Sequence, residues 1–168
     1  MKVLHLITTI DRGGAENQLK ILVKEQLSQG IEVSILPLKG KMDLLAEFRE
    51  IGAEVITEFV NMSPVKQLRL IARKNLMFDV IHAHLPRAEI TGSLIKKNCF
   101  YVVSKHNTEP FFPGAPKFLS TFLARFVSNR TDAIIGISQA VRNYLISNKE
   151  VSRKKRYRSS FTGMTGPR

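Results

Sequence analysis

The sequence has little cysteine and no apolar run long enough to cross a bilayer. Its single cysteine, Cys99, cannot form a disulfide within the chain, which fits a reducing compartment. The apolar run after Lys2 ends at Thr8 without a small-residue cleavage pattern, so we interpret it as a strand rather than a signal peptide. We therefore expect a cytoplasmic chain, and its 168 residues, 43% of them hydrophobic, are enough for one well-buried domain.

Three common site motifs are missing as well. The glycine pattern G-x-G-x-x-G of dinucleotide sites and the pattern G-x-x-x-x-G-K-[ST] of nucleoside-triphosphatases do not occur at the first turn. No G-x-S-x-G elbow or Ser/His/Asp order supports a hydrolase. If the first turn binds a phosphate, it does so with fewer glycines and without a lysine.

Basic residues outnumber acidic ones, with 26 Lys and Arg against 14 Asp and Glu and a net charge of +12. The segment 149–168 contributes +6, which is half of the excess. Its tract 153–158 would attract phosphates, but no known nucleic-acid-binding fold or array of stacking aromatics accompanies it. A nucleic-acid-binding fragment is therefore an alternative that we do not favour. We expect 1–148 to form the domain and 149–168 a disordered basic tail or a broken interdomain linker.

Strand and helix patterns alternate along most of the chain. We expect six strands, at about residues 2–8, 31–36, 54–58, 79–84, 100–105 and 132–137. We expect helices at about residues 15–29, 42–51, 63–76, 86–97, 117–129 and 138–147. Most of the strands are apolar along much of their length, which is typical of a parallel sheet covered on both faces. The predicted fold is a Rossmann-like doubly wound α/β domain.

The turn after the first strand carries two adjacent glycines, Gly13 and Gly14, at the start of a long helical pattern. The first amides of a helix lack internal partners and carry the positive end of the helix dipole, so an anion can bind there. Glycine pairs also occur in tight connections that bind nothing. From spacing alone both interpretations remain open.

Polar residues follow several of the predicted strands. They are Gly13 and Gly14 after the first strand, His82 and His84 on the fourth, His106 and Asn107 after the fifth, and Ser138 after the sixth. Ligands of such sheets bind at the carboxyl ends of the strands, so these residues are expected to share one edge. His106 is the best catalytic candidate because it starts an irregular loop. Glu16 and Glu109 are either an acid and base pair or structural carboxylates.

His82 and His84 share one face of a strand because they are two residues apart. Two imidazoles can bind one metal ion, but a zinc site needs three or four organised ligands, and no third ligand has a suitable spacing. We therefore expect no metal. One of the two histidines is expected to pack against the first strand and the other to border the cleft.

Four segments in this order resemble the N-terminal domain of glycosyltransferase family 4. They are Arg12-Gly13-Gly14-Ala15-Glu16 after the first strand, Asp79-Val80-Ile81-His82-Ala83-His84, the strand that ends in His106-Asn107, and Asp132-Ala133-Ile134-Ile135-Gly136-Ile137-Ser138. The resemblance covers about residues 1–150. That family has the GT-B architecture, in which two Rossmann-like domains face each other across a cleft.

The resemblance implies a retaining transfer of a sugar, such as a hexose, from a UDP- or GDP-linked donor to a glycan or lipid-linked acceptor, without a metal or other cofactor. Gly13 and Gly14 would face the donor's diphosphate, and His106 would lie beside the transferred sugar and its phosphate. The domain would mainly shape the acceptor pocket. The candidates for that pocket are Glu16, His84, Asn107, Glu109 and Ser138.

The sequence departs from the family after residue 150. The family continues into a second domain that holds most of the nucleotide site and two glutamates separated by seven residues. Here the segment 157–164 has a faint likeness to the family's linker strand, but Arg158 and Ser159 interrupt it. A frameshifted or truncated end would look like this, and so would a deliberate fragment. We expect such a chain to transfer sugar negligibly unless a separate chain supplies the other half.

One predicted helix leaves a further alternative open, a non-catalytic module that binds acceptor or membrane surface. Its apolar face is flanked by Lys117, Arg125 and Arg130 and consists of Phe118, Leu119, Phe122, Leu123 and Phe126. Such a face can pack on the sheet or lie on anionic lipid at the inner face of the membrane. We favour packing on the sheet, because helical apolar stripes usually serve the core.

Overall fold

The computed structural model describes residues 1–73, 77–112, 114–151 and 157–159. Most of the basic tract, residues 153–156, lies outside the described residues. The strands are β1 (Lys2–Ile7), β2 (Glu32–Pro37), β3 (Glu54–Val55), β4 (Val80–His84), β5 (Phe100–Lys105), β6 (Ala133–Gly136) and β7 (Tyr157–Ser159). The helices are α1 (Gly14–Ser28), α2 (Leu45–Glu50), α3 (Pro64–Arg73), α4 (Pro86–Ile95), α5 (Lys117–Arg130) and α6 (Gln139–Ser147).

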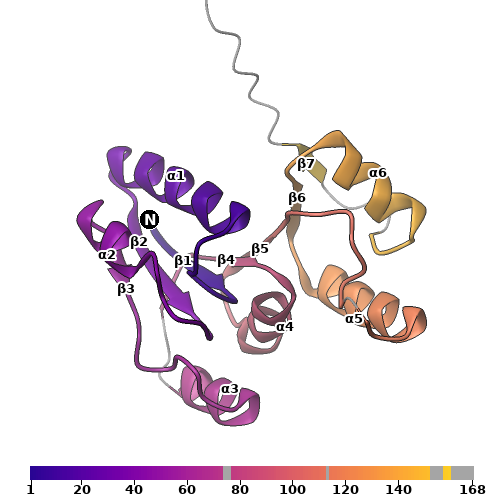
Figure 1. Cartoon of the computed structure of the whole chain (residues 1–168), viewed down its shortest axis with the longest axis horizontal. Helices are drawn as coiled ribbons and strands as arrows, with labels where there is room; N and C mark the ends of the chain where they lie inside the picture. Colours follow the sequence, from indigo (N-terminus) through magenta and orange to yellow (C-terminus); the bar gives the residue numbers. More distant parts are fainter. Residues whose placement is uncertain (74–76, 113, 152–156, 160–168) are drawn as a thin grey trace, which may run out of the picture.

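The strands form one parallel sheet in the order β3-β2-β1-β4-β5-β6-β7, which confirms the predicted Rossmann-like doubly wound α/β fold (Figure 1). The strand order reverses between β1 and β4, so the chain leaves these two neighbouring strands in opposite directions along the sheet. A crevice opens at such a switch point, outside the carboxyl ends of the strands. The fold thus places the predicted site edge at the ends of β1, β4 and β5.

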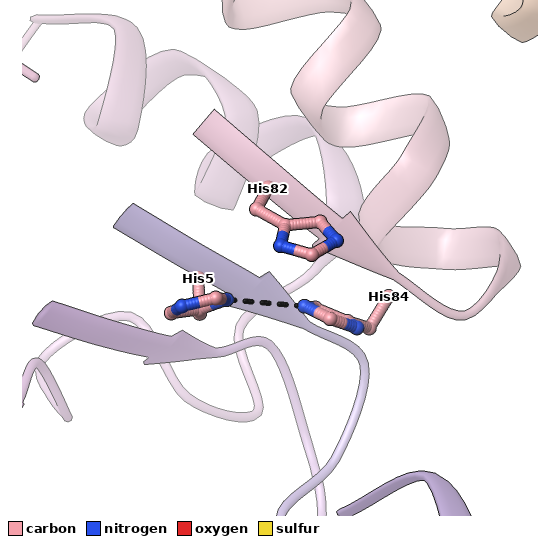
Figure 2. A group of neighbouring side chains, drawn as sticks. All are labelled: His5, His82 and His84. Atoms are coloured by element: carbon pink, nitrogen blue, oxygen red, sulfur yellow. Dashed lines mark hydrogen bonds between the residues drawn. The ribbon is translucent and has the colours of Figure 1, made fainter. Parts of the chain in front are cut away.

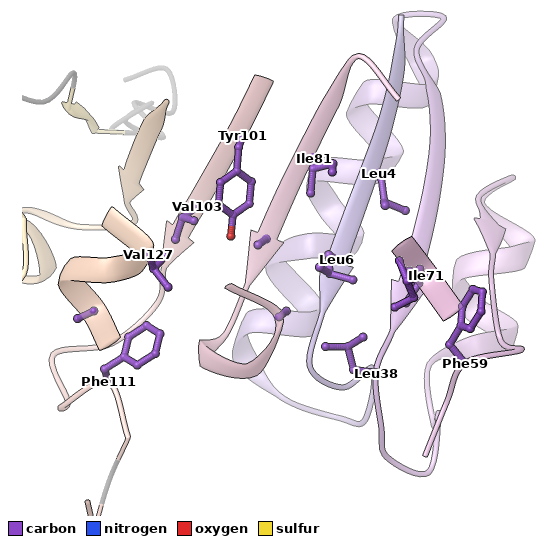
Figure 3. Packing of buried hydrophobic residues seen from close by; sticks show 14 residues of the cluster. Leu4, Leu6, Leu38, Phe59, Ile71, Ile81, Tyr101, Val103, Phe111 and Val127 are labelled. Atoms are coloured by element: carbon purple, nitrogen blue, oxygen red, sulfur yellow. The ribbon is translucent and has the colours of Figure 1, made fainter. Parts of the chain in front are cut away.

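Two layers of helices cover the sheet. Helices α1, α2 and α6 lie on one face, and α3, α4 and α5 lie on the other (Figure 1). The larger core fills the second face, where Leu4 and Leu6 of β1 pack with Tyr101 and Val103 of β5 beneath α4 and α5 (Figure 3). Because side chains alternate along a strand, the residues between these, including His5, point toward α1.

Helix α1 begins and ends where the glycines predicted. Gly13 is its N-cap residue, with an extended backbone. At the other end Gly30 has a φ of 73°, which only glycine adopts without strain. Its N–H donates to the Leu27 carbonyl and that of Ile31 donates to the Gln26 carbonyl, at 3.0 and 3.1 Å. This pair of bonds is a Schellman motif, and it satisfies two carbonyls that the helix end leaves free.

Some elements differ in length from the predicted ones. The predicted helix 42–51 is shorter, with bounds Leu45–Glu50, and the predicted strand 54–58 is reduced to Glu54–Val55. Pro37 is the last residue of β2 and pairs with Ile7, although it was expected to stop the strand one residue earlier. Within the predicted tail the described residues contain a seventh strand, β7, which pairs with β6. Pairing through backbone groups does not depend on the apolar pattern that the sequence lacks there.

The prediction that the apolar face of α5 packs on the sheet is wrong for three of its five residues. Phe118, Leu119 and Phe122 are 78%, 41% and 65% exposed. The face that α5 buries consists of Ser120, Ala124, Val127 and Ser128. Small residues on this stripe allow the helix to lie close to its neighbours. Leu123 and Phe126 pack partly buried beside it, and Phe118 and Phe122 face outward.

Gly92 of α4 packs directly on Tyr101, and this contact supports a stability prediction. A Cβ atom at Gly92 would lie 2.7 Å from Cε2 of the fully buried Tyr101. The ring cannot move freely, because its hydroxyl donates to the Glu89 carbonyl at 2.6 Å. We expect Gly92→Ala to lower the free energy of unfolding by about 1–3 kcal/mol through overpacking, measured by urea unfolding.

The matched control is Gly14→Ala, because a Cβ atom there would meet nothing within 4 Å. Gly14 lies in a helix, so alanine is expected to leave the stability unchanged or to raise it by up to about 1 kcal/mol. Equal unfolding midpoints for the two variants would show that the contact with Tyr101 does not constrain the fold.

Candidate functional site

All four histidines of the sequence lie together at the switch point. His5 comes from β1, His82 and His84 come from β4, and His106 directly follows β5. The parallel register pairs His5 with His82, and Figure 2 shows the His5 and His84 rings pointing toward each other. The ring centroids of His82 and His84 are 4.2 Å apart, and those of His84 and His106 are 5.5 Å apart.

Hydrogen bonds join three of these rings into a chain that runs from the interior to the cleft edge. Nδ1 of His5 lies 3.1 Å from Nε2 of His84, and Nδ1 of His84 lies 3.2 Å from Nε2 of His106. Both ends of the chain meet glutamines of α1. Oε1 of Gln26 lies 2.7 Å from Nε2 of His5, and Oε1 of Gln18 lies 3.3 Å from Nδ1 of His106.

Burial keeps these imidazoles neutral. It lowers the pKa of His5 to about 4, although the hydrogen bond with Gln26 opposes this shift. Burial also lowers the pKa of His82 and His84 well below the usual value, and the neighbouring histidines add to the effect. The pKa of His106 is lowered to about 4 by burial and by the charge of Lys105. At neutral pH the cluster is therefore uncharged and offers lone pairs and N–H groups.

The structure supplies a third imidazole that the sequence reasoning missed. Ligand atoms of His5, His82 and His84 all lie within 4.8 Å of one another, close enough for one metal ion. Both ring nitrogens of His5 and both ring nitrogens of His84 already have hydrogen-bond partners. A metal ion bound by these rings would therefore replace the hydrogen bond that joins His5 to His84. The absence of a metal stays a prediction. The residue that could have indicated this third ligand is His5, because its strand pairs with the strand that carries His82.

The glycine turn lies on the same edge of the sheet, at the start of α1. A Cβ atom at Gly13 would lie 2.4 Å from Oε2 of Glu16, so the Glu16 carboxylate sits against this turn. Glu16 is 7% exposed and accepts a hydrogen bond from Oγ1 of Thr9 at 2.7 Å. At Gly14, by contrast, neither packing nor a positive φ requires a glycine. The open space there leaves the first turn of α1 accessible to a ligand.

A cavity of about 180 Å³ lies beside His106. Its lining includes Leu85, Glu89, Lys105, Asn107, Glu109, Phe111 and Glu150. The Lys105 ammonium donates to the buried Glu89 carboxylate at 2.5 Å and lies 4.3 Å from the centre of the Phe111 ring. Burial raises the pKa of Glu89 and Glu150, and the charge of Lys105 opposes both shifts. The cavity thus combines carboxyl groups, a cation and an aromatic face, which suits a polyhydroxyl ligand.

The other predicted residues divide between this cavity and structural positions. Asn107 and Glu109 are exposed, and the Asn107 amide donates to the Glu109 carboxylate at 3.1 Å. Oγ of Ser138 accepts from the N–H of Val141 at 3.2 Å, which confirms the predicted cap of the last helix. His84 is only 2% exposed, so it lies behind His106 rather than at the surface.

The backbone between β4 and α4 is strained at Leu85. Its φ of 73° and ψ of 149° are unusual for a residue with a side chain and cost of order 1–3 kcal/mol. Leu85 lies between His84 and the first residue of α4, and it lines the cavity beside His106. The strain is thus located at the edge that carries the candidate site.

A second, larger cavity lies at the opposite edge of the sheet. It has a volume of about 650 Å³ and is lined by residues at the starts of the strands, such as Lys2, Glu32 and Asp79. None of the predicted site residues borders it. We assign the site to the smaller cavity, because ligands of open parallel sheets bind at the carboxyl edge.

In the described part of the chain no helix is both long and apolar enough to span a bilayer.

Comparisons with known proteins agree with this geometry. The family model described as Glycosyltransferase Family 4 matches residues 12–157. No curated protein sequence matches the chain. Among solved structures, HepE of Anabaena in complex with UDP is similar with a TM-score of 0.67 and 20% identity over 95% of this chain and 43% of that one.

Two further solved structures show the same fold. A glycosyltransferase of Rickettsia africae has a TM-score of 0.70 and 16% identity over 94% of this chain and 42% of its own. Sucrose-phosphate synthase of Thermosynechococcus elongatus has a TM-score of 0.67 and 12% identity over 95% and 47%. The chain therefore spans less than half the length of these structures.

The neutral histidine cluster makes folding stability depend on pH. The folded pKa of His5, about 4, lies below the unfolded value of 6.5, so the fold favours the neutral ring. Its contribution is fully present above pH 6.5 and is lost as the pH falls toward 4; for His5 alone it amounts to about 3 kcal/mol. We expect the free energy of unfolding, measured in urea, to fall steeply between pH 7 and pH 5, and less steeply in His5→Gln.

Leu4→Val is the matched control, because it weakens the core of the same strand without removing a titrating group. This variant should be less stable at every pH but keep the wild-type slope. If the free energy of unfolding of His5→Gln changed with pH as steeply as that of the wild type, His5 would not contribute to the pH dependence.

Proposed function

The chain belongs to glycosyltransferase family 4, and from that premise we propose that it forms the acceptor-side half of a retaining glycosyltransferase that uses a nucleotide sugar. The observation that carries the proposal is the open first turn of α1 at Gly14, on the same sheet edge as His106. Free amides at a helix start attract a diphosphate. The proposed acceptor is a glycan or a lipid-linked sugar.

The contact between His106 and Gln18 supports the proposal, because it places the imidazole one turn beyond the glycines along α1. A diphosphate bound at Gly14 would thus have its sugar close to His106. The HepE structure contains UDP, and a second HepE structure contains UDP-glucose. We propose a donor of the same class for this chain, with no metal and no other cofactor.

The cavity beside His106 is the proposed acceptor pocket. Glu109 and Asn107 stand at its exposed side, and the buried Glu89 and Lys105 form its interior. Carboxylates and amides hydrogen-bond sugar hydroxyl groups, and the Phe111 ring offers an apolar face for a sugar ring. The volume of about 180 Å³ suits a single sugar unit.

One domain alone is not expected to catalyse the transfer. The transition state carries positive charge on the sugar and growing negative charge on the leaving diphosphate, so fixed dipoles must surround it and exclude water. We propose that the described residues around His106 form one side of such a cleft. We propose that a second GT-B domain, in the same polypeptide or in a separate chain, supplies the other side and most of the nucleotide site.

We expect the 168-residue chain to bind UDP-glucose weakly and to transfer sugar negligibly. Gly14→Ala should lower the affinity about tenfold, because the added methyl group keeps the phosphates from charge-assisted bonds with the first amides of α1. Glu16→Gln should raise the affinity roughly threefold, because it removes a like charge from this turn. An NMR titration of the labelled chain with UDP-glucose, and with UDP as competitor, measures all three affinities.

Gln29→Ala is the matched control, because Gln29 lies at the other end of α1 and is exposed. It should bind UDP-glucose as the wild type does. Equal affinities of the wild type, Gly14→Ala and Glu16→Gln would remove the donor from this turn. Robust sugar transfer by the purified chain would contradict the proposal that catalysis needs a second domain.

A second proposal concerns the exposed face of α5. Phe118 and Phe122 project from this helix beside the exposed Lys117 and Arg125, which is the pattern of a helix that lies on an anionic membrane. Helix α5 follows the loop that carries His106, and Oγ of Ser120 accepts from the N–H of Phe112 in that loop at 3.0 Å. We propose that α5 rests on the cytoplasmic leaflet and brings the cleft to a lipid-linked acceptor.

We expect the wild-type chain to sediment with vesicles that contain anionic lipid and the double variant Phe118→Ser/Phe122→Ser to remain in the supernatant. Each phenylalanine that enters the interface contributes about 1.5–3 kcal/mol, and the basic residues add the dependence on anionic lipid. Vesicle co-sedimentation with neutral and anionic lipid measures both effects.

The matched control is Ile21→Ser/Val65→Ser, which removes two apolar residues that are 70% and 69% exposed on other helices. This variant should still sediment with the vesicles. Binding that is independent of anionic lipid, or that both double variants lose equally, would eliminate a role of α5.

A further inference from the structure

The buried hydrogen-bond chain has four links and two glutamine ends. The links are Gln26 to His5, His5 to His84, His84 to His106, and His106 to Gln18, at 2.7, 3.1, 3.2 and 3.3 Å. Each ring uses one nitrogen for the link before it and the other nitrogen for the link after it. The nitrogen that carries the proton in one ring therefore determines whether the facing nitrogen of the next ring donates or accepts the hydrogen bond between them.

Counting protons limits the chain to two arrangements. Four links need four protons, and three neutral rings supply only three. The fourth proton must come from the amide group of one glutamine, which then turns its nitrogen toward the rings. If Gln18 turns, all three rings carry the proton on Nε2. If Gln26 turns, all three rings carry it on Nδ1.

The two ends differ in how firmly they hold their orientation. Gln26 is partly buried and its oxygen lies 2.7 Å from His5, whereas Gln18 is exposed and its oxygen lies 3.3 Å from His106. The shorter and less exposed bond is the stronger one, and an exposed amide turns at little cost because water can replace its partner. The geometry therefore favours Gln26 as the acceptor and Gln18 as the end that turns.

We propose that Gln26, His5 and His84 are positioning residues that hold His106 as the Nε2–H tautomer. In this arrangement Nε2 of His106 donates inward to Nδ1 of His84. Nδ1 of His106 carries no proton and accepts from the amide group of the exposed Gln18. Gln26 selects this state through His5 and His84, although it has no contact with His106.

The selected state determines which ligand group His106 can bind. A ring nitrogen without a proton accepts a hydrogen bond and cannot donate one. A ligand group that replaces the exposed Gln18 amide at Nδ1 of His106 must therefore be a donor, such as a hydroxyl group, and not a phosphate oxygen. Resting on the proposed function, this assigns His106 to a hydroxyl of a bound sugar. The diphosphate is left to the first turn of α1. The tautomer itself does not depend on which ligand binds.

The test uses the full chain labelled with ¹⁵N in its histidines and needs no donor, acceptor or second domain. The sequence has only four histidines, so each ring can be assigned by single substitution, and two-bond ¹⁵N–¹H correlation spectra at neutral pH report which nitrogen carries the proton. We expect the Nε2–H tautomer for His5, His84 and His106. Gln26→Leu removes the inner acceptor, so His106 should lose its single tautomer and shift toward Nδ1–H.

Two further variants separate this role from a merely structural one. Gln26→Glu keeps an acceptor at this position, so His106 should remain Nε2–H. Gln29→Leu changes the C-cap residue of α1, whose side chain bonds Glu25 and not a histidine ring, and it should leave the spectrum unchanged. If Gln26→Leu fails to fold, the tautomers of the wild type and of Gln26→Glu still decide the question.

An Nδ1–H tautomer of His106 in the wild type would overturn the proposal, and so would a folded Gln26→Leu variant with unchanged tautomers. Failure of the proposed function gives a different result, because UDP-glucose would then not bind while the tautomers remain as expected. The spectra and the donor titration therefore test the two proposals separately.

Discussion

The parallel pairing of β1 with β4 is the constraint on which the candidate site depends. It joins residues 3–7 to residues 80–84, and it creates the point where the strand order reverses. The same register puts His5 beside His82 and brings the end of β1, with its glycine turn, next to His84. A shift of one residue in β4 would turn its histidines toward the opposite core. The glycine turn and the histidine cluster thus depend on one set of backbone hydrogen bonds.

The interior near this pairing is unusual because polar rings occupy a position that apolar side chains normally fill. The three buried histidines lie on the face covered by α1, whose packing residues Leu19 and Val23 belong to the neighbouring core. A buried polar group is costly unless it is hydrogen-bonded, and here each ring has a partner. The arrangement exchanges some hydrophobic stabilisation for rings that hold a fixed orientation at the cleft.

The sequence predicted the fold well because its signals are local. Gly30 ends α1, Ser138 caps α6, and the apolar strands require cover on both faces. The location of His106 followed from the rule that places loops of the carboxyl edge together. His5 was missed because its neighbours depend on strand order and register, which residue spacing within one strand does not contain. The exposed side of α5 was missed because helical periodicity defines a stripe but not the direction in which it faces.

Leu85 gives the site a mechanical property. Its side chain packs against the core beneath α1, while its strained backbone joins β4 to α4. On one side the His84 carbonyl accepts from the N–H of Thr8 at 3.3 Å, and on the other the Leu85 carbonyl accepts from the N–H of Glu89 at 3.0 Å. A corner fixed in this way has no soft torsion that would let the helix swing away from the strand. We expect that a ligand which displaces the loop after β1 shifts His84 and the start of α4 together with it.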